Sequence, residues 1–152
     1  MAIDAARAAA LELPSLTVTV ERGRLRFFAR TIGETDPVYL DAEAARAAGH
    51  PDVLIPPTFL FSLGLESPDP FGYLDALEID LGRVLHGEQS FDYHALAYAG
   101  DELRLDERIT DVYAKRGGAL EFVTKTTSVT RAGEPIADLR SVIVVRNPEV
   151  TA

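Results

Sequence analysis

The fold is decided by one stretch of sequence, Pro56-Pro57-Thr58-Phe59-Leu60-Phe61-Ser62-Leu63-Gly64-Leu65, which would be apolar on almost every side of a helix. A helix without a polar face is buried inside a protein. Proline is favoured in the first helical turn, so Pro57 suits the start of such a helix. We therefore expect a central buried helix at about residues 57–66, with a second layer of structure around it.

The second half of the chain predicts an antiparallel sheet. Apolar and polar residues alternate over residues 84–94, as in a strand with one buried face. This alternation places Leu85, Gln89, Phe91 and Tyr93 on one face and His86, Glu88, Ser90, Asp92 and His94 on the other. Turns at 99–101, 116–118 and 132–134 separate three more strands, at 102–113, 119–131 and 135–146. We expect these strands to form a three- to four-strand antiparallel meander.

The first half is mainly helical. Residues 16–20 have the β-branched alternation of a strand, whereas residues 22–32 and 41–48 have the spacing and end signals of helices. A buried helix that precedes a long antiparallel sheet predicts an α+β fold with the sheet wrapped around that helix. We expect a single domain over residues 1–152, in which residues 1–15 are an N-terminal extension.

Composition excludes several classes of function. The chain has 152 residues, a net charge of −9 and no cysteine, so it has no thiol nucleophile, disulfide or thiolate metal site. It lacks the basic stripe that nucleic acids require and any glycine-rich phosphate loop. No histidine spacing indicates a metal site. Without a secretory signal or a membrane-length apolar run, we expect a cytoplasmic protein with no membrane partner.

Three stretches together resemble the MaoC-like dehydratase/hydratase family: residues 30–41 (RTIGETDPVYLD), the Pro56-Pro57-Thr58 helix start, and residues 93–101 (YHALAYAGD). The resemblance covers residues 16–147 and implies the hotdog fold, in which a sheet wraps a central helix. It also implies loss of water from a 3-hydroxyacyl thioester, or addition of water to an enoyl thioester, with R stereochemistry. The similarity is to the single-domain N-terminal branch, which includes one subunit of heterodimeric hydroxyacyl-ACP dehydratases.

The resemblance implies where the catalytic residues should lie. Active members share the acid–base work between an Asp and a His spaced Asp-x-x-Pro-x-His. Anchored on Pro37, this spacing places Glu34 at the Asp position and Tyr39 at the His position, with Asp36 as a surrogate acid. A phenol with a pKa of about 10 is less suited than imidazole to proton transfer at neutral pH. The alternative is structural: Glu34 and Asp36 in a hydrogen-bonded turn, and Tyr39 as a half-buried aromatic.

Other residues are candidates for catalysis or substrate binding. His86 and Glu88 share a strand face, so they could form a catalytic pair or a solvated polar face. Gln89 faces inward, where it could contact substrate or brace the helix. Backbone N–H groups at the start of the central helix could stabilise the thioester oxygen, which makes Pro57, Thr58 and Phe59 substrate-binding candidates.

Two functions follow from these residues and the resemblance. The first is an (R)-specific 3-hydroxyacyl-thioester dehydratase or enoyl-thioester hydratase that uses Glu34 and Tyr39, with Asp36 and His86. The alternative is a non-catalytic acyl-binding subunit of a heteromeric hotdog dehydratase. Coenzyme A or acyl-carrier protein would carry the substrate, bound through arginines of residues 22–30, and no cofactor is expected. An exposed sheet edge predicts a homodimer or a heterodimer with a second hotdog subunit.

Overall fold

A computed structural model describes residues 2–150, so both ends of the predicted 1–152 domain lie outside the described residues. Within residues 2–150, five strands form one antiparallel sheet in the order β1-β3-β4-β5-β2. The strands are β1 Leu16–Thr19, β2 Val84–Tyr93, β3 Glu102–Lys115, β4 Leu120–Arg131 and β5 Glu134–Arg146. The predicted strands and turns of the second half are therefore confirmed within a few residues.

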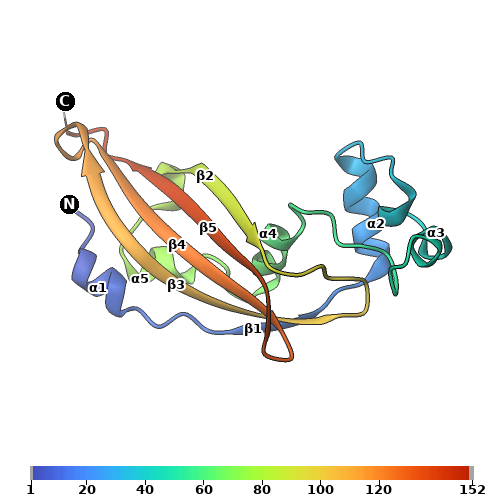
Figure 1. Ribbon diagram of the computed structural model, residues 1–152. Coiled ribbons are helices and arrows are strands. Elements are labelled where there is room, and N and C mark those ends of the chain that lie inside the picture. Colours follow the sequence, from blue (N-terminus) through green and yellow to red (C-terminus); the bar gives the residue numbers. More distant parts are fainter. Residues whose placement is uncertain (1, 151–152) are drawn as a thin grey trace.

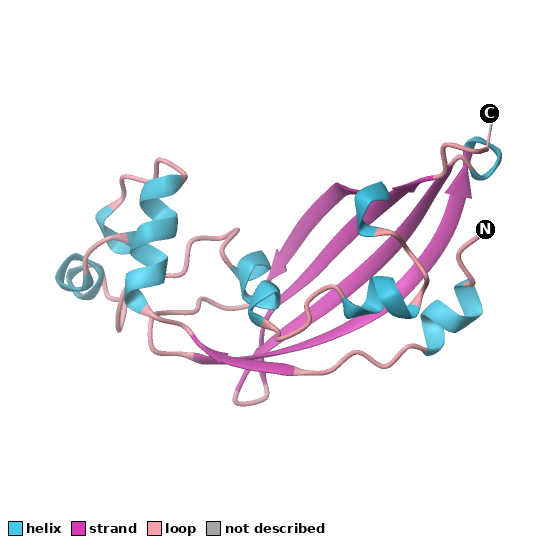
Figure 2. Ribbon diagram, turned by 180° about the vertical axis from the view of Figure 1, so that it is seen from behind, coloured by secondary structure: helices cyan, strands magenta, loops and turns pink. Residues whose placement is uncertain are grey.

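Short helices lie on one face of the curved sheet and beyond one of its ends (Figures 1 and 2). α4 and α5 lie over the sheet, α1 runs beside β3, and α2 and α3 stand beyond the end of the sheet. The α-helices are α1 Ala5–Ala10, α2 Arg22–Thr31, α3 Ala42–Ala47, α4 Leu60–Leu63 and α5 Gly72–Ala76. Four 3-10 helices accompany them within the described residues: η1 Pro37–Tyr39, η2 Gly64–Glu66, η3 Leu81–Arg83 and η4 Arg116–Gly118.

The strand order confirms three strands of the predicted three- to four-strand meander and excludes the fourth. β3, β4 and β5 follow one another as hairpins, but β2 pairs with β5 at the far edge and not with β3. The reason is the segment between β2 and the turn before β3, which binds the chain ahead of α4 and so keeps β2 from pairing with β3 as a hairpin. Ile55 N–H donates to the Ala97 carbonyl at 3.0 Å, and Ala99 N–H donates to the Val53 carbonyl at 2.9 Å.

The central helix is shorter and less buried than its sequence predicts. It consists of α4 and η2 over residues 60–66, and residues 57–59 form the turn before it. Leu60 and Leu63 are fully buried, but Phe61 and Leu65 are 39% and 49% exposed. The helix therefore has a buried side and an exposed apolar side, because the curved sheet covers only one of them.

A β-bulge at Gly87 corrects the predicted faces of β2. The pairing with β5 shifts between His86 and Glu88, so one extra residue enters the strand and the alternation is displaced. His86 consequently faces the helices together with Gln89, Phe91 and Tyr93, whereas Leu85 is on the outer face and 54% exposed. Glycine suits the bulge because a Cβ atom there would lie 2.8 Å from Cγ2 of Val144.

Two apolar clusters form the core on the helix side of the sheet. The larger one joins α2 and α4 to the sheet near β1, and the smaller one joins α1 and α5 to the opposite end. The predicted N-terminal extension takes part in the second cluster, because Ala8 is fully buried there. The large buried side chains of the first cluster include Leu25, Leu60, Leu63, Leu103, Val129 and Ile136, and the second includes Leu74, Leu77, Ile109, Val123 and Val145.

Candidate functional site

The segment between α2 and α3 is a hydrogen-bonded turn that positions Tyr39. The Oε1 atom of Glu34 accepts hydrogen bonds from the backbone N–H groups of Thr35 at 2.8 Å and Asp36 at 2.9 Å. Oδ1 of Asp36 accepts from the N–H of Val38 at 3.1 Å and so caps η1. Both carboxylates thus support the turn itself, as the structural alternative predicts. A catalytic role for either residue stays a prediction.

Tyr39 lines a cavity of about 220 Å³ beside the start of α4. The N–H of Leu54 donates to the carbonyl of Val38 at 3.0 Å, which holds this segment against the chain that leads into α4. Tyr93 comes from the end of β2, and Pro57 comes from the turn before the helix. Apolar side chains complete the wall, including Ile55, Leu60, Leu96 and Ile136. We call this space the tyrosine cavity.

The two tyrosines of this cavity keep their protons at neutral pH. Burial raises the pKa of Tyr39, and the nearby carboxylates of Glu34 and Asp36 raise it further. Burial and the proximity of Tyr39 raise the pKa of Tyr93 to about 12. Such phenols can donate hydrogen bonds to a carbonyl or hydroxyl oxygen, but they are poor proton acceptors.

The substrate-binding residues predicted at the start of the helix lie in three different environments. Pro57 lines the tyrosine cavity, as described above. Thr58 is exposed to solvent. Phe59 is buried in the core, where its ring packs edge-on against Phe28 with 5.3 Å between centroids. Its N–H donates to the Pro56 carbonyl at 3.0 Å, so that group is already engaged within the chain.

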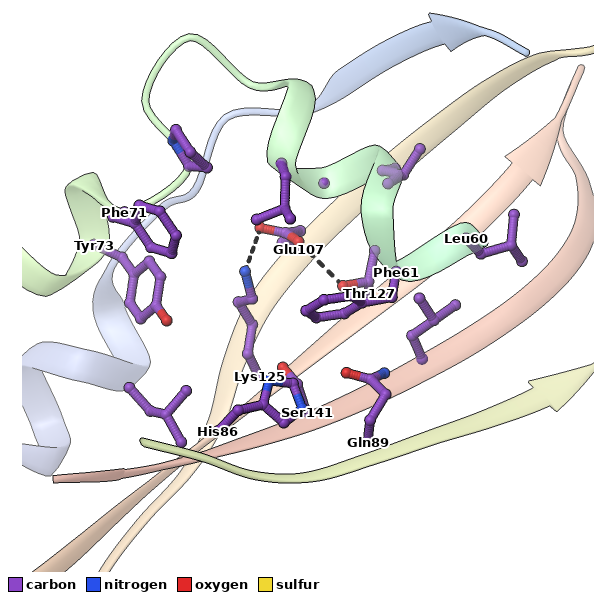
Figure 3. Close-up of a pocket in the computed structure, with 16 residues that line it drawn as sticks. Leu60, Phe61, Phe71, Tyr73, His86, Gln89, Glu107, Lys125, Thr127 and Ser141 are labelled. Carbon is purple, nitrogen blue, oxygen red and sulfur yellow. Dashed lines mark hydrogen bonds and ion pairs between the residues drawn. The ribbon is translucent and has the colours of Figure 1, made fainter. Parts of the chain in front are cut away.

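A second cavity, of about 90 Å³, lies between the sheet and the α4–η2 segment (Figure 3). It contains an ion pair: Nζ of Lys125 on β4 lies 2.9 Å from Oε2 of Glu107 on β3. The hydroxyl of Thr127 donates to Oε1 of Glu107 at 3.2 Å. Tyr73 closes one side of the cavity, and burial together with Glu107 raises the pKa of this phenol to about 12. We call this space the polar cavity.

His86 and Gln89 line the polar cavity, not the tyrosine cavity. The His86 ring packs edge-on against Phe61 with 5.2 Å between centroids. The predicted pair of His86 with Glu88 is wrong, because the bulge turns Glu88 to the outer face, where it pairs with Arg140 at 2.9 Å. The predicted site residues are therefore distributed over two cavities.

Leu60 is the one residue that the linings of the two cavities share. It is 1% exposed and projects from the first turn of α4. A long, flexible ligand that enters beside Tyr39 would have to pass Leu60 to reach Lys125.

The sequence reasoning missed the residues that make the second cavity polar. Glu107 occupies the strand face of Leu103, Leu105 and Ile109, and Lys125 and Thr127 occupy that of Val123 and Val129. A polar residue that interrupts an alternating apolar face is a signal that could have identified them. Tyr93 carried no such signal, because its approach to Tyr39 depends on the folded chain.

The arginines of α2, which were expected to bind an acidic carrier, differ in their contacts. On α2, Arg22 donates from Nε to Oδ1 of Asp52 at 2.9 Å and lowers the pKa of that carboxyl to about 2. Arg24 forms an ion pair with Glu66. Arg26 and Arg30 form no ion pair with the described residues 2–150.

Two further absences concern the described residues only. Across residues 2–150, no group of three or more metal-ligating side chains is assembled. Among the described helices, none is long and apolar enough to cross a bilayer.

Comparison with known proteins decides the family. A family model described as "FAS1-like, dehydratase domain region" matches residues 9–139. The chain belongs to this dehydratase family. A UPF0336 protein of Saccharopolyspora erythraea is 37% identical over 134 residues, which cover 88% of this chain and 85% of that protein.

Solved structures of hotdog dehydratases share the fold of this dehydratase-family chain. A chain of the HadBC complex of Mycobacterium tuberculosis, a (3R)-hydroxyacyl-ACP dehydratase, is 25% identical with a TM-score of 0.73 and coverage of 88% and 92%. A protein described as a MaoC-like dehydratase is 25% identical with a TM-score of 0.80, over 94% of this chain and 44% of that one. The expected resemblance to MaoC-like hotdog dehydratases and the expected fold class are confirmed.

Proposed function

We propose that this chain is the acyl-binding, non-catalytic subunit of a heteromeric dehydratase that acts on (3R)-hydroxyacyl thioesters. A second hotdog subunit with the Asp-x-x-Pro-x-His motif supplies the acid and the base. This chain supplies the cavity that receives the acyl group.

One observation carries the proposal: the groups at the two expected catalytic positions are unsuited to proton transfer. Elimination of water requires a base that removes the proton from the carbon beside the thioester, and an acid that protonates the leaving hydroxyl. Oε1 of Glu34 accepts two backbone hydrogen bonds, and the phenol of Tyr39 has a raised pKa. Glu34 is held in its own turn through Oε1 and lines neither cavity, and the phenol of Tyr39 holds its proton. These observations support a base and an acid supplied by another subunit.

The tyrosine cavity supports a role in binding. Its walls are mainly apolar, which suits an alkyl chain, and two protonated phenols stand among them. Tyr39 and Tyr93 can donate hydrogen bonds to the thioester or hydroxyl oxygen of a substrate. Arg26 and Arg30 on α2 are suited to the phosphates of coenzyme A or to an acidic carrier protein.

The edge of the sheet supports the partner. β2 is an edge strand, and the described residues leave its outer backbone groups without a neighbouring strand. Exposed apolar side chains accompany this edge, with Leu85 54% and Leu96 52% exposed. The HadBC relative is a complex of dehydratase subunits by its description. A second hotdog subunit along β2 would extend the sheet and cover these side chains.

The test is hydration of crotonyl-CoA, followed by the loss of enoyl absorbance. The purified chain alone should show no hydration above the buffer rate, and Glu34→Ala and Tyr39→Phe should not change that result. Addition of a hotdog subunit from the same organism that carries the Asp-x-x-Pro-x-His motif should produce activity. Hydration by the chain alone that disappears in Glu34→Ala would instead support a self-sufficient hydratase.

A further inference from the structure

The polar cavity is the feature of the molecule that a plain acyl-binding function does not explain. The neighbouring positions on the same strand faces are Leu105, Ile109, Val123 and Val129, none of them more than 6% exposed. An alkyl chain that binds between a helix and a sheet is stabilised by contact with such apolar side chains. Here an ion pair stands in their place (Figure 3).

The side chains of this cavity are held in place from several directions. The Glu107 carboxylate binds Lys125 through one oxygen and Thr127 through the other. The ammonium group of Lys125 also lies 5.0 Å from the centre of the Tyr73 ring. Gly64 leaves room on the helix side, since a Cβ there would lie 3.3 Å from Oε1 of Glu107. An ammonium carries three N–H donors, so Lys125 has donors beyond the one directed at Glu107.

Gln89 adds an acceptor that the chain does not use. Its Nε2 group donates to the carbonyl of Ser90 at 3.3 Å, which sets the orientation of the amide. The Oε1 atom is then buried and has no hydrogen-bond partner among the described residues. Buried acceptors are normally paired, because an unpaired one loses its hydration without replacement. A ligand that donates a hydrogen bond would satisfy this atom.

We propose that the polar cavity binds a hydroxyl group on the acyl chain of the substrate, several carbons beyond the thioester. The proposal rests on the proposed function, in which the acyl chain enters through the tyrosine cavity and passes Leu60. A hydroxyl in this cavity can donate to Oε1 of Gln89 or accept from Nζ of Lys125, whereas a methylene group can do neither. The substrates are then hydroxylated acyl thioesters and not plain alkyl ones.

The test measures binding and does not depend on catalysis. The full chain is titrated by calorimetry with S-decanoyl pantetheine, and then with each isomer that carries a hydroxyl on one carbon from the fifth to the tenth. Pantetheine is the part that coenzyme A and acyl-carrier protein have in common. One hydroxylated isomer should bind about tenfold more tightly than the decanoyl thioester, because it satisfies the buried acceptor.

Variants locate the preference. Gln89→Leu removes the unpaired acceptor, and Thr127→Val removes the hydrogen bond to Glu107 that helps to hold the Glu107–Lys125 pair in place. Each should bring the affinity for the preferred isomer down to that for the decanoyl thioester. Thr124→Val is the matched control, since Thr124 is a buried threonine of the same strand on the opposite face, and it should keep the preference. Thermal unfolding and circular dichroism of each variant show whether it is folded.

The outcomes separate the two proposals. If the decanoyl thioester binds and no hydroxylated isomer binds more tightly, the hydroxyl-binding proposal is wrong and the acyl-binding function stands. If the preference persists in both Gln89→Leu and Thr127→Val, the polar cavity is not its source and the proposal is likewise wrong. If no thioester binds, the acyl-binding function is wrong and this inference falls with it.

Discussion

The tyrosine cavity and the polar cavity meet at Leu60 but differ in chemistry. The polar cavity lies between the inner face of the sheet and the α4–η2 segment, whereas the tyrosine cavity lies beside the start of α4, and Leu60 lines both. The first is mainly aliphatic, with two protonated phenols. The second contains the Glu107–Lys125 ion pair, with side chains about one-fifth exposed.

The difference between these cavities shows how little of a site is determined by its fold. Two polar side chains on β4 and one on β3 replace the apolar residues that the alternation would otherwise place on the inner face. The backbone pairing continues through them, because their charges and hydroxyls satisfy one another. The fold provides the space, and individual side chains at fixed register decide what the space can bind.

Removal of the wall between the cavities should have the largest effect. Leu60→Ala should lower the free energy of unfolding by about 3 kcal/mol, as is usual for a buried leucine, and should join the two spaces. Urea denaturation measures the loss. Leu63→Ala is the matched control, because Leu63 is equally buried on the same helix but lines neither cavity. Equal losses with altered thioester binding only in Leu60→Ala would agree with the division described here, whereas altered binding in both would contradict it.

Separation of the ion pair should have the next largest effect. Lys125→Met leaves the Glu107 carboxylate partly buried without its cation, which should cost about 2 kcal/mol after allowance for its exposure. The double variant Lys125→Met/Glu107→Leu should recover more than half of that loss, because no charge remains. The comparison uses urea unfolding of the four proteins in the cycle. A double variant that is no more stable than Lys125→Met would mean that the pair is not coupled.

The bulge that turns His86 toward the polar cavity should be sensitive to a single methyl group. In Gly87→Ala the new Cβ would meet Cγ2 of Val144 at 2.8 Å and the carbonyl of Val142 at 3.1 Å. We expect a loss of about 1–2 kcal/mol from the strain on β2 and β5. Gly100→Ala would introduce strain of another kind, so Gly23→Ala, where no atom lies within 4 Å, is the better control. A fully stable Gly87→Ala protein would contradict the assigned register.

Titration of the tyrosines should distinguish the cavities with the smallest perturbation. Burial raises the pKa values of Tyr73 and Tyr93 to about 12, with a smaller contribution from Glu107 to the first and from Tyr39 to the second. Glu107→Gln should therefore lower the pKa of Tyr73 only, and Tyr39→Phe that of Tyr93 only. The ultraviolet absorbance of phenolate measures both pKa values, and the variants Tyr73→Phe and Tyr93→Phe assign each titration to its tyrosine.

These two tyrosines also affect stability at high pH. The pKa of each tyrosine in the folded protein lies above the unfolded value of about 10. Their contribution to the free energy of unfolding is therefore fully present below pH 10 and is lost as the pH rises toward 12. Tyr73→Phe should reduce this alkaline loss. An unchanged alkaline profile in that variant would contradict the assignment.

The sequence predicts the layers of this molecule better than the details of its cavities. Alternation identified the strands because a half-buried sheet imposes a period of two, and the residues near Pro37 identified the family. The bulge at Gly87 was missed because a glycine alone does not predict a bulge. The one extra residue moves the side chains that precede it in β2 to the opposite faces of the sheet. The length and burial of the helix at 57–66 were overestimated, because an apolar composition does not show that the sheet leaves Phe61 and Leu65 uncovered.

The polar cavity could not be assembled from the sequence for a different reason. Glu107 and Lys125 are 18 residues apart and meet only through the register of β3 with β4. Gln89 reaches the same space from the edge strand, through the pairing of β2 with β5. A polar residue that interrupts the apolar face can be recognised in each strand separately. The sequence does not show that the polar residues of different strands meet in the same cavity.

The central claim is that the acid and base of the reaction belong to a second subunit, and kcat of the reconstituted complex tests it most directly. With crotonyl-CoA, Glu34→Gln and Tyr39→Phe in this chain should leave kcat within about tenfold of the unmodified complex. Replacement of the motif histidine by alanine in the other subunit should lower kcat by roughly 100-fold or more. The reverse result, a loss of that size from Glu34→Gln with little effect of the histidine, would place the chemistry in this chain and contradict the account.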